Sequence, residues 1–269
     1  MRLSPLSRIS MRVVALAYLL VLLVLPLVII LWRSFAHGIA QFYDWISTPA
    51  AISAFNITMI IVLIVVPLNV LFGIVTSIAL VRGNFPGRRL VQGVVDLPFA
   101  VSPVVVGVSL IMLWGVRGWF GGIEHLGFRV IFSLPGMVIA TLFVTLPYVV
   151  REVEPVLHEI GDDQEQAAVT LGASRWQTFW RITLPAIRWG LTYGVVLTVA
   201  RALGEFGGVI MVSTGLPGGG QTLTLLVNAR YMDDRNVFGA YCAATLLMGM
   251  GLVTLALMIL LERKRSTVK

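Results

Sequence analysis

The side chains best placed for chemistry form a polar stretch between two long apolar segments. This stretch covers residues 159–185 and reads EIGDDQEQAAVTLGASRWQTFWRITLP. Acidic residues gather at its start, and tryptophan, phenylalanine and arginine follow. The chain has no H-E-x-x-H, G-x-S-x-G or zinc-ligand spacing. The residue types therefore favour binding to another protein over catalysis.

Two capping signals predict a pair of short helices within this stretch. Asp162 followed by Glu165 is a capping-box pattern that predicts a helix start. Gly172 is a natural helix end, because glycine tolerates the left-handed conformation. Ser174 with Gln177 forms a second capping-box pattern. The sequence thus predicts a helix, a glycine turn and a second helix.

The second predicted helix carries an aromatic face. Trp176, Phe179 and Trp180 have the i, i+3, i+4 spacing that places side chains on one side of a helix. Pro185 either ends this helix or begins the next segment in its first turn. We expect the aromatic face to dock on a partner.

The same stretch resembles the EAA loop of ABC-transporter permease subunits. The resemblance is carried by an alanine pair, a glycine and an Ile-x-Leu-Pro ending at the family's spacing, here Ala167-Ala168, Gly172 and Ile182-Thr183-Leu184-Pro185. At the position of the family's usual glutamate this chain has Gln166, with Glu165 one place earlier, so a hydrogen bond but no charge is available there. The resemblance implies that the turn at Gly172 passes the movement of a separate ATPase to the spans. The residues implied in this coupling are Glu165, Gln166, Ala167, Ala168, Gly172, Ile182, Leu184 and Pro185.

A second polar feature lies inside an apolar segment. Arg201 and Glu205 are i, i+4, the spacing at which opposite charges meet on one helix face. An arginine near the centre of a membrane helix costs about 2.5–3.5 kcal/mol, so it pairs or faces a polar cavity. Two interpretations stay open, an ion pair that holds this span to its neighbours and a group lining the route of an anion. The neighbouring glycines, Gly204, Gly207 and Gly208, predict close helix approach.

A third feature is the dipeptide Ser102-Pro103, which interrupts an apolar segment. Together with Gly107 it predicts either a simple kink or the start of a half-helix directed at a translocation pathway. Ser102 is therefore a further candidate for lining that pathway.

The composition is that of an integral membrane protein. Of the 269 residues 58% are hydrophobic and only 12% are charged, and the mean hydropathy is +0.91. The net charge is +7, but the arginines lie at the ends of apolar segments, which indicates topology signals and not nucleic-acid binding. The single cysteine, Cys242, excludes a disulfide framework. No cofactor is expected.

The apolar segments predict an all-α, polytopic protein with six transmembrane helices. The expected spans are residues 13–32, 54–81, 91–114, 134–150, 186–212 and 237–261. We expect the first to be retained and not cleaved as a signal peptide, because it is longer than a usual signal core and has no A-x-A-like site. The predicted organisation is a head, first span and external loop (1–52), a permease domain (53–265) that includes the loop 159–185, and a tail (266–269).

The positive charges predict the orientation. An even number of spans puts both termini on one side, and most of the 20 Lys and Arg residues lie on that side. By the positive-inside rule the termini and residues 159–185 are cytoplasmic. An ATP-driven partner in the cytoplasm then has access to the loop.

Two further stretches narrow the resemblance. Leu203–Gly207 (LGEFG) and Gly219–Leu225 (GGQTLTL) resemble oxyanion-importer permeases, and most of all the W-type subunit of sulfate/thiosulfate importers. That family implies a prokaryotic inner membrane, a second homologous permease, two ATP-binding subunits and an extracytoplasmic sulfate-binding protein. It also implies that most anion selectivity belongs to the binding protein.

Other classes remain as alternatives. A molybdate or tungstate ABC permease is the nearest. An ion-driven secondary anion transporter is a different class, and it would need more ionisable groups inside the membrane than the pair at Arg201 and Glu205. The chain has no G-x-x-x-x-G-K-[ST] motif, so we expect any ATPase to be a separate polypeptide.

Overall fold

The computed structural model describes residues 5–266, with side chains from Ser10 to Leu260 except Glu124 and His125. Every regular element in this part of the chain is helical, which confirms the all-α prediction. The predicted tail, 266–269, lies outside the described residues except for the backbone of Ser266. In chain order the elements are α1 (Pro5–Leu19), η1 (Leu20–Val24), α2 (Leu25–Phe35), α3 (Ile39–Ile46), α4 (Pro49–Arg82), α5 (Arg88–Ala100), α6 (Pro103–Trp114), η2 (Gly121–Leu126), α7 (Leu134–Ile160), α8 (Asp163–Thr170), α9 (Arg175–Thr178), η3 (Phe179–Thr183), α10 (Leu184–Leu203), α11 (Gly207–Val212), α12 (Leu223–Asn228), η4 (Ala229–Asp233) and α13 (Val237–Ser266).

Helices cover the six predicted spans, and the third and the fifth are each interrupted. Five helical stretches of the described chain are long and apolar enough to cross a bilayer, and α5 with α6 forms a sixth that bends by 113°. Ser102 lies at this bend, ahead of the proline that begins α6. The predicted break at Ser102-Pro103 is thus confirmed. Pro98, in contrast, lies within α5.

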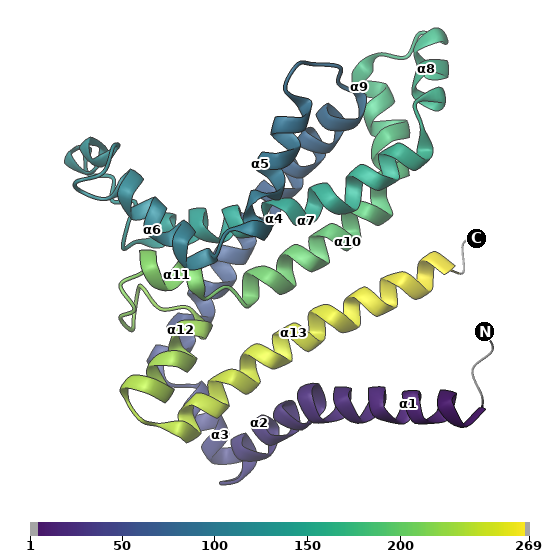
Figure 1. The fold of residues 1–269 in the computed structure, drawn as a ribbon. Helices are drawn as coiled ribbons and strands as arrows, with labels where there is room; N and C mark the ends of the chain where they lie inside the picture. Colours follow the sequence, from purple (N-terminus) through teal and green to yellow (C-terminus); the bar gives the residue numbers. More distant parts are fainter. Residues whose placement is uncertain (1–4, 267–269) are drawn as a thin grey trace.

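The spans run side by side, and the polar loop lies at one end of them. The first turns of α1, the last turns of α13, and α8 with α9 all lie towards the right of Figure 1. Helices α3, α11 and α12 lie at the opposite end of the spans (Figure 1). This arrangement agrees with an even number of crossings.

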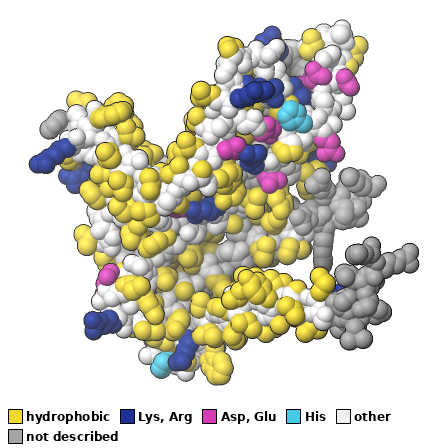
Figure 2. Space-filling view, in the orientation of Figure 1, with side chains coloured by type: hydrophobic (Ala, Val, Ile, Leu, Met, Phe, Trp, Pro, Cys, Tyr) yellow, Lys and Arg dark blue, Asp and Glu magenta, His cyan; other side chains and the backbone are white. Residues whose placement is uncertain are grey.

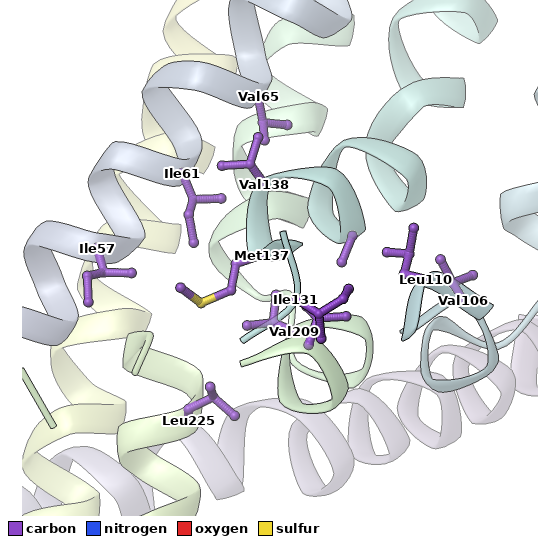
Figure 3. Packing of buried hydrophobic residues seen from close by; sticks show 12 residues of the cluster. Ile57, Ile61, Val65, Val106, Leu110, Ile131, Met137, Val138, Val209 and Leu225 are labelled. Carbon is purple, nitrogen blue, oxygen red and sulfur yellow. The ribbon is translucent and has the colours of Figure 1, made fainter. Parts of the chain in front are cut away.

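The main apolar core lies where α4, α6, α7 and α11 meet. Ile61 and Val65 of α4, Val106 of α6, Met137 of α7 and Val209 of α11 are buried there together. Figure 3 shows their side chains converging from these helices. Since lipid is as apolar as these side chains, close packing rather than exclusion from water stabilises such contacts.

The first span stands apart from this core. None of the residues in its most apolar window is buried against the rest of the described chain. Its principal polar contact is at the end of α2, where Ser34 donates to the carbonyl of Tyr241 at 2.8 Å and lies 2.5 Å from the hydroxyl of Thr245. The remaining surface is available to lipid or to another membrane protein.

The fifth span differs from the prediction of one helix over 186–212. Helix α10 ends at Leu203, and α11 begins only at Gly207. The backbone leaves the helix at Gly204, and the carboxylate of Glu205 accepts a hydrogen bond from the backbone N–H of Gly208 at 2.8 Å. The carboxylate thus provides an acceptor for one of the backbone N–H groups that have no partner at the start of α11.

Candidate functional site: the loop of residues 159–185

The loop folds as two short helices around a glycine, as its sequence predicts. Helix α8 ends in a turn at Gly172, whose φ of +88° is in the left-handed region. The N–H groups of Gly172 and Ala173 donate to the carbonyls of Val169 and Ala168, both at 3.0 Å. Because few residues other than glycine adopt this conformation without strain, Gly172 determines the angle between the two helices.

Of the two predicted capping boxes, only the second forms. The N–H of Gln177 donates to Ser174 Oγ at 3.3 Å, and the N–H of Ser174 donates to Gln177 Oε1 at 2.9 Å. The box predicted from Asp162 and Glu165 is wrong, since the Asp162 side chain makes no cap bond to the backbone. Asp162 instead accepts from the side chain of Gln166 at 2.7 Å, and Glu165 is bound elsewhere.

The second helix continues into the membrane span. Pro185 does not end it, because the helix runs without a break from Arg175 to Leu203. A π-helical turn, η3, precedes the proline, and the N–H of Leu184 donates to the carbonyl of Phe179. A proline inside an α-helix clashes with the carbonyl four residues earlier, and a wider turn gives that carbonyl room. The loop is therefore continuous with α10.

The aromatic face lies on the outside of the loop. The rings of Trp176, Phe179 and Trp180 contact one another, with centroids 5.5–6.3 Å apart. Trp176 is 70% exposed, Trp180 50% and Leu171, at the turn, 88%. Charged side chains of both signs gather in the same part of the molecule (Figure 2). We refer to Leu171, Trp176, Phe179 and Trp180 as the loop surface.

Glu165 has partners that the sequence did not indicate. Its Oε2 accepts from Arg82 Nε at 3.0 Å, and its Oε1 accepts from Thr183 Oγ1 at 2.8 Å. Arg82 is the last residue of α4, so the contact joins positions 83 residues apart. In the sequence Arg82 is one of the arginines at the ends of apolar segments, which indicate topology. The one signal that could have predicted this contact is an arginine at the end of a span on the same side of the membrane as an acidic loop.

The other predicted coupling residues surround these contacts. Gln166 and Ala167 are exposed, whereas Ala168 is half-buried. Ile182 and Leu184 are half-buried at the start of the span, and Pro185 is exposed. The exposed Gln166 carries no charge, and the neighbouring carboxylate of Glu165 is occupied by Arg82.

The second candidate pair, Arg201 and Glu205, is formed but not on one continuous helix. Nη1 of Arg201 lies 2.6 Å from Oε2 of Glu205, although Oε2 has no aligned hydrogen-bond donor among the described residues. The Glu205 side chain is 1% exposed and that of Arg201 is 29% exposed. The backbone carbonyl of Glu205 also accepts from Thr224 at 2.8 Å. The pair thus joins the end of α10 to α11 and α12.

The space beside Glu205 is too small for an oxyanion. A cavity of about 10 Å³ lies there, lined among others by Thr58, Thr141 and Thr222. A volume near 10–15 Å³ accommodates about one water molecule. Within this chain the geometry therefore favours the interpretation that the pair holds the helices together.

Glycines bring α6 and α11 together, in part as predicted. A side chain at Gly107 would place its Cβ 2.6 Å from Cβ of Met211 and 2.8 Å from the carbonyl oxygen of Gly208. Gly207 approaches Pro103 in the same way, whereas Gly204 has no such neighbour. Ser102 itself is exposed and makes no side-chain cap bond to α6.

The sequence is similar to a known family of membrane proteins and to individual members of it. The model described as "Binding-protein-dependent transport system inner membrane component" matches residues 69–267. The "Sulfate transport system permease protein CysW" of Synechocystis sp. is 46% identical over 251 residues, covering 93% of this chain and 91% of the relative. The "Sulfate transport system permease protein CysT" of the same organism is 36% identical over 252 residues, covering 93% and 88%.

A solved structure has the same fold. It is described as a bacterial alginate ABC transporter in complex with an alginate pentasaccharide-bound periplasmic protein. The similarity has a TM-score of 0.77 at 18% identity and covers 96% of this chain and 93% of the other.

Proposed function

The chain belongs to the family of binding-protein-dependent transport system inner membrane components, and from this premise we propose that it is the W-type permease subunit of an ATP-driven importer of sulfate or thiosulfate. It is an inner-membrane permease subunit and not an ATPase. In the proposed complex it forms half of the translocation pathway. A second, homologous permease forms the other half, two separate subunits hydrolyse ATP, and an extracytoplasmic sulfate-binding protein delivers the anion.

The observation that carries this proposal is the loop surface. It presents large apolar side chains, Leu171, Trp176 and Trp180, on a loop that is anchored at both ends. Exposed aromatic groups of this kind are typical of the core of a protein–protein interface. Because α9 is continuous with α10, a subunit that moves the loop surface also moves a membrane span. We infer that the ATPase docks here.

The orientation follows from the charges. We propose that the loop and both termini face the cytoplasm, since most Lys and Arg residues lie at that end of the spans. Gln166 then faces the ATPase without a charge. This predicts that docking rests on the apolar loop surface more than on an ion pair at this position.

The anion and the second permease are inferred from the relatives. The relatives named above are sulfate permeases of two kinds from one organism, and both are similar to this chain. This supports pairing with a homologous permease and not with a second copy. The small cavity at Glu205 supports a pathway formed between two permeases and not inside one.

Uptake of radiolabelled sulfate, in cells that lack only this chain, tests the substrate. Restoring the chain is expected to restore uptake, with thiosulfate as an effective competitor and molybdate as a weak one. Uptake that molybdate abolishes and sulfate does not would replace the proposed substrate with molybdate.

Co-purification tests the docking surface. The variant Trp176→Glu is expected to lose the ATPase from the purified complex, because it places a charge in an apolar interface. Trp119→Glu is the matched control, since Trp119 is 87% exposed in the segment that follows α6, and α6 lies far from α8 in Figure 1. Loss of the ATPase from both variants, or from neither, would contradict the assignment of this surface.

A further inference from the structure

Arg82 makes three polar contacts, which reach the end of α7 and the first turn of α8. Its Nε donates to Glu165 at 3.0 Å, its Nη1 to the carbonyl of Leu157 at 3.2 Å and its Nη2 to the carbonyl of Gly161 at 2.5 Å. The side chain is 21% exposed. Each nitrogen of the guanidinium group therefore has an acceptor, and all three acceptors lie at least 75 residues further along the chain.

Two of these acceptors belong to the end of α7. Leu157 is in the last turn of that helix, and Gly161 is its C-cap, with a φ of +66°. Carbonyls at a helix end have no partner within the helix and carry partial negative charge. An arginine is well suited to them, since its fork of donors reaches several acceptors and keeps its charge.

The third acceptor extends the junction to α8 and α10. Glu165 is in the first turn of α8, and its second carboxylate oxygen accepts from Thr183. Thr183 is 7% exposed and immediately precedes α10. Helix α8 has no buried residue of its own, so these polar contacts determine where it sits against the spans.

The helices that meet at this junction are also packed together beneath it. Val149, Val153 and Leu157 of α7 form a buried cluster with Ile187 of α10, and Val81 of α4 packs against it. Figure 1 shows α8 beyond the end of α7, with α10 beside that helix. A displacement of α8 that does not break the contacts of Glu165 must therefore displace the ends of these spans.

We propose that Arg82 is a positioning residue for coupling, which holds α8 through Glu165 so that movement of the loop reaches α4 and α7 as well as α10. This inference rests on the proposed function, because it takes the loop surface as the place where the ATPase acts. It adds a second mechanical connection to the one through Gly172 and η3. A loop without Arg82 is still joined to α7 and α10 through the backbone, but α8 then turns more freely about Gly161 and loses its link to α4.

Four variants test the inference. Arg82→Gln removes the positive charge and leaves one donor nitrogen in place of three. Glu165→Gln keeps the shape and an acceptor for Thr183 but presents no charge to Arg82. Arg89→Gln is the matched control, because it removes the same charge from an exposed position seven residues away. Arg82→Lys adds a conservative variant, which keeps the charge but cannot reach three acceptors with one nitrogen.

The first readout is the position of α8 and does not depend on the transported anion. Amide hydrogen exchange over residues 161–172 is measured in the purified complex. Arg82→Gln and Glu165→Gln are expected to speed exchange in α8 about tenfold, which corresponds to about 1.4 kcal/mol, near the lower end of what a hydrogen bond to a charged group contributes. Arg89→Gln is expected to stay within about twofold of the natural chain, as surface substitutions do.

The second readout is anion imported per ATP hydrolysed by the complex in proteoliposomes. It is expected to fall severalfold in Arg82→Gln and Glu165→Gln, less in Arg82→Lys and not in Arg89→Gln. A role in folding alone would lower the yield of complex and leave this ratio unchanged. If Arg82→Gln yields no complex, the two readouts on Glu165→Gln decide.

Unchanged exchange and an unchanged ratio in Glu165→Gln would overturn the inference. So would a ratio that falls equally in Arg89→Gln. Failure of the natural complex to import sulfate would instead overturn the proposed substrate, and the exchange measurement on α8 would still decide the role of Arg82.

Discussion

Replacing Arg201 by Ala leaves the carboxylate of Glu205 buried without its ion-pair partner. The Glu205 side chain is 1% exposed, and among the described residues its carboxylate keeps one hydrogen bond, from the N–H of Gly208 at 2.8 Å. Removing one partner of a buried pair costs about 3–5 kcal/mol, because the other charge stays desolvated. Since Arg201 is itself 29% exposed, water already screens part of the interaction, and we expect about 3 kcal/mol.

The lone cysteine provides the assay. Cys242 is free and buried, so a thiol-reactive fluorophore labels it only as the protein unfolds in detergent. With about 2–4 °C per kcal/mol for a chain of this size, Arg201→Ala is expected to lower the midpoint of unfolding by about 6–12 °C. Arg188→Ala, at an exposed position in the same helix, is the control and is expected to change the midpoint by about 2 °C or less.

A second variant separates the charge from the packing. In Arg201→Ala/Glu205→Gln the charge is removed, while an amide oxygen remains to accept from Gly208. This double variant is expected to recover most of the lost stability. A double variant as unstable as Arg201→Ala would refute the ion pair as the cause, and an unchanged midpoint in Arg201→Ala would refute its contribution altogether.

Three further substitutions follow from backbone geometry. Gly172→Val forces a β-branched residue into the left-handed region, at a cost of about 1–2 kcal/mol. It is expected to lower the amount of anion imported per ATP hydrolysed in proteoliposomes. An unchanged ratio would show that the turn has no part in the mechanism. Gly107→Leu is expected to separate α6 from α11, because its Cβ would lie 2.6 Å from that of Met211. We expect a loss of stability of about 1–3 kcal/mol in the same cysteine-labelling assay. Equal stability would show that α6 can shift without a loss of stability. Ser174→Ala removes half of the capping box, which contributes about 1 kcal/mol. It is expected to speed amide exchange at the start of α9 about fivefold. Equal exchange in the variant and the natural chain would argue against the cap.

The parts of the fold that depend on residues close together in the sequence could be predicted from the sequence alone. The spans follow from runs of apolar residues, since a bilayer admits only helices of sufficient length. The left-handed turn at Gly172 and the capping box of Ser174 and Gln177 depend on residue types within three or four positions. The bend at Ser102-Pro103 likewise depends only on residues next to it in the sequence.

Some parts of the sequence interpretation stay predictions. These are the molybdate and ion-driven alternatives, the domain bounds and the roles of the site residues.

The tertiary structure decided which of several local possibilities a residue takes. Glu165 could have bonded to its own helix start, as the capping pattern predicted, but the guanidinium of Arg82 offers it a charged donor, which is about twice as strong as a neutral one. The end of α10 at Leu203 likewise involves a distant residue, because the carbonyl of Glu205 just beyond it accepts a hydrogen bond from Thr224 of α12. Arg82 and Glu165 are 83 residues apart, and no spacing rule connects such positions; the packing of α4 against α7 brings them together.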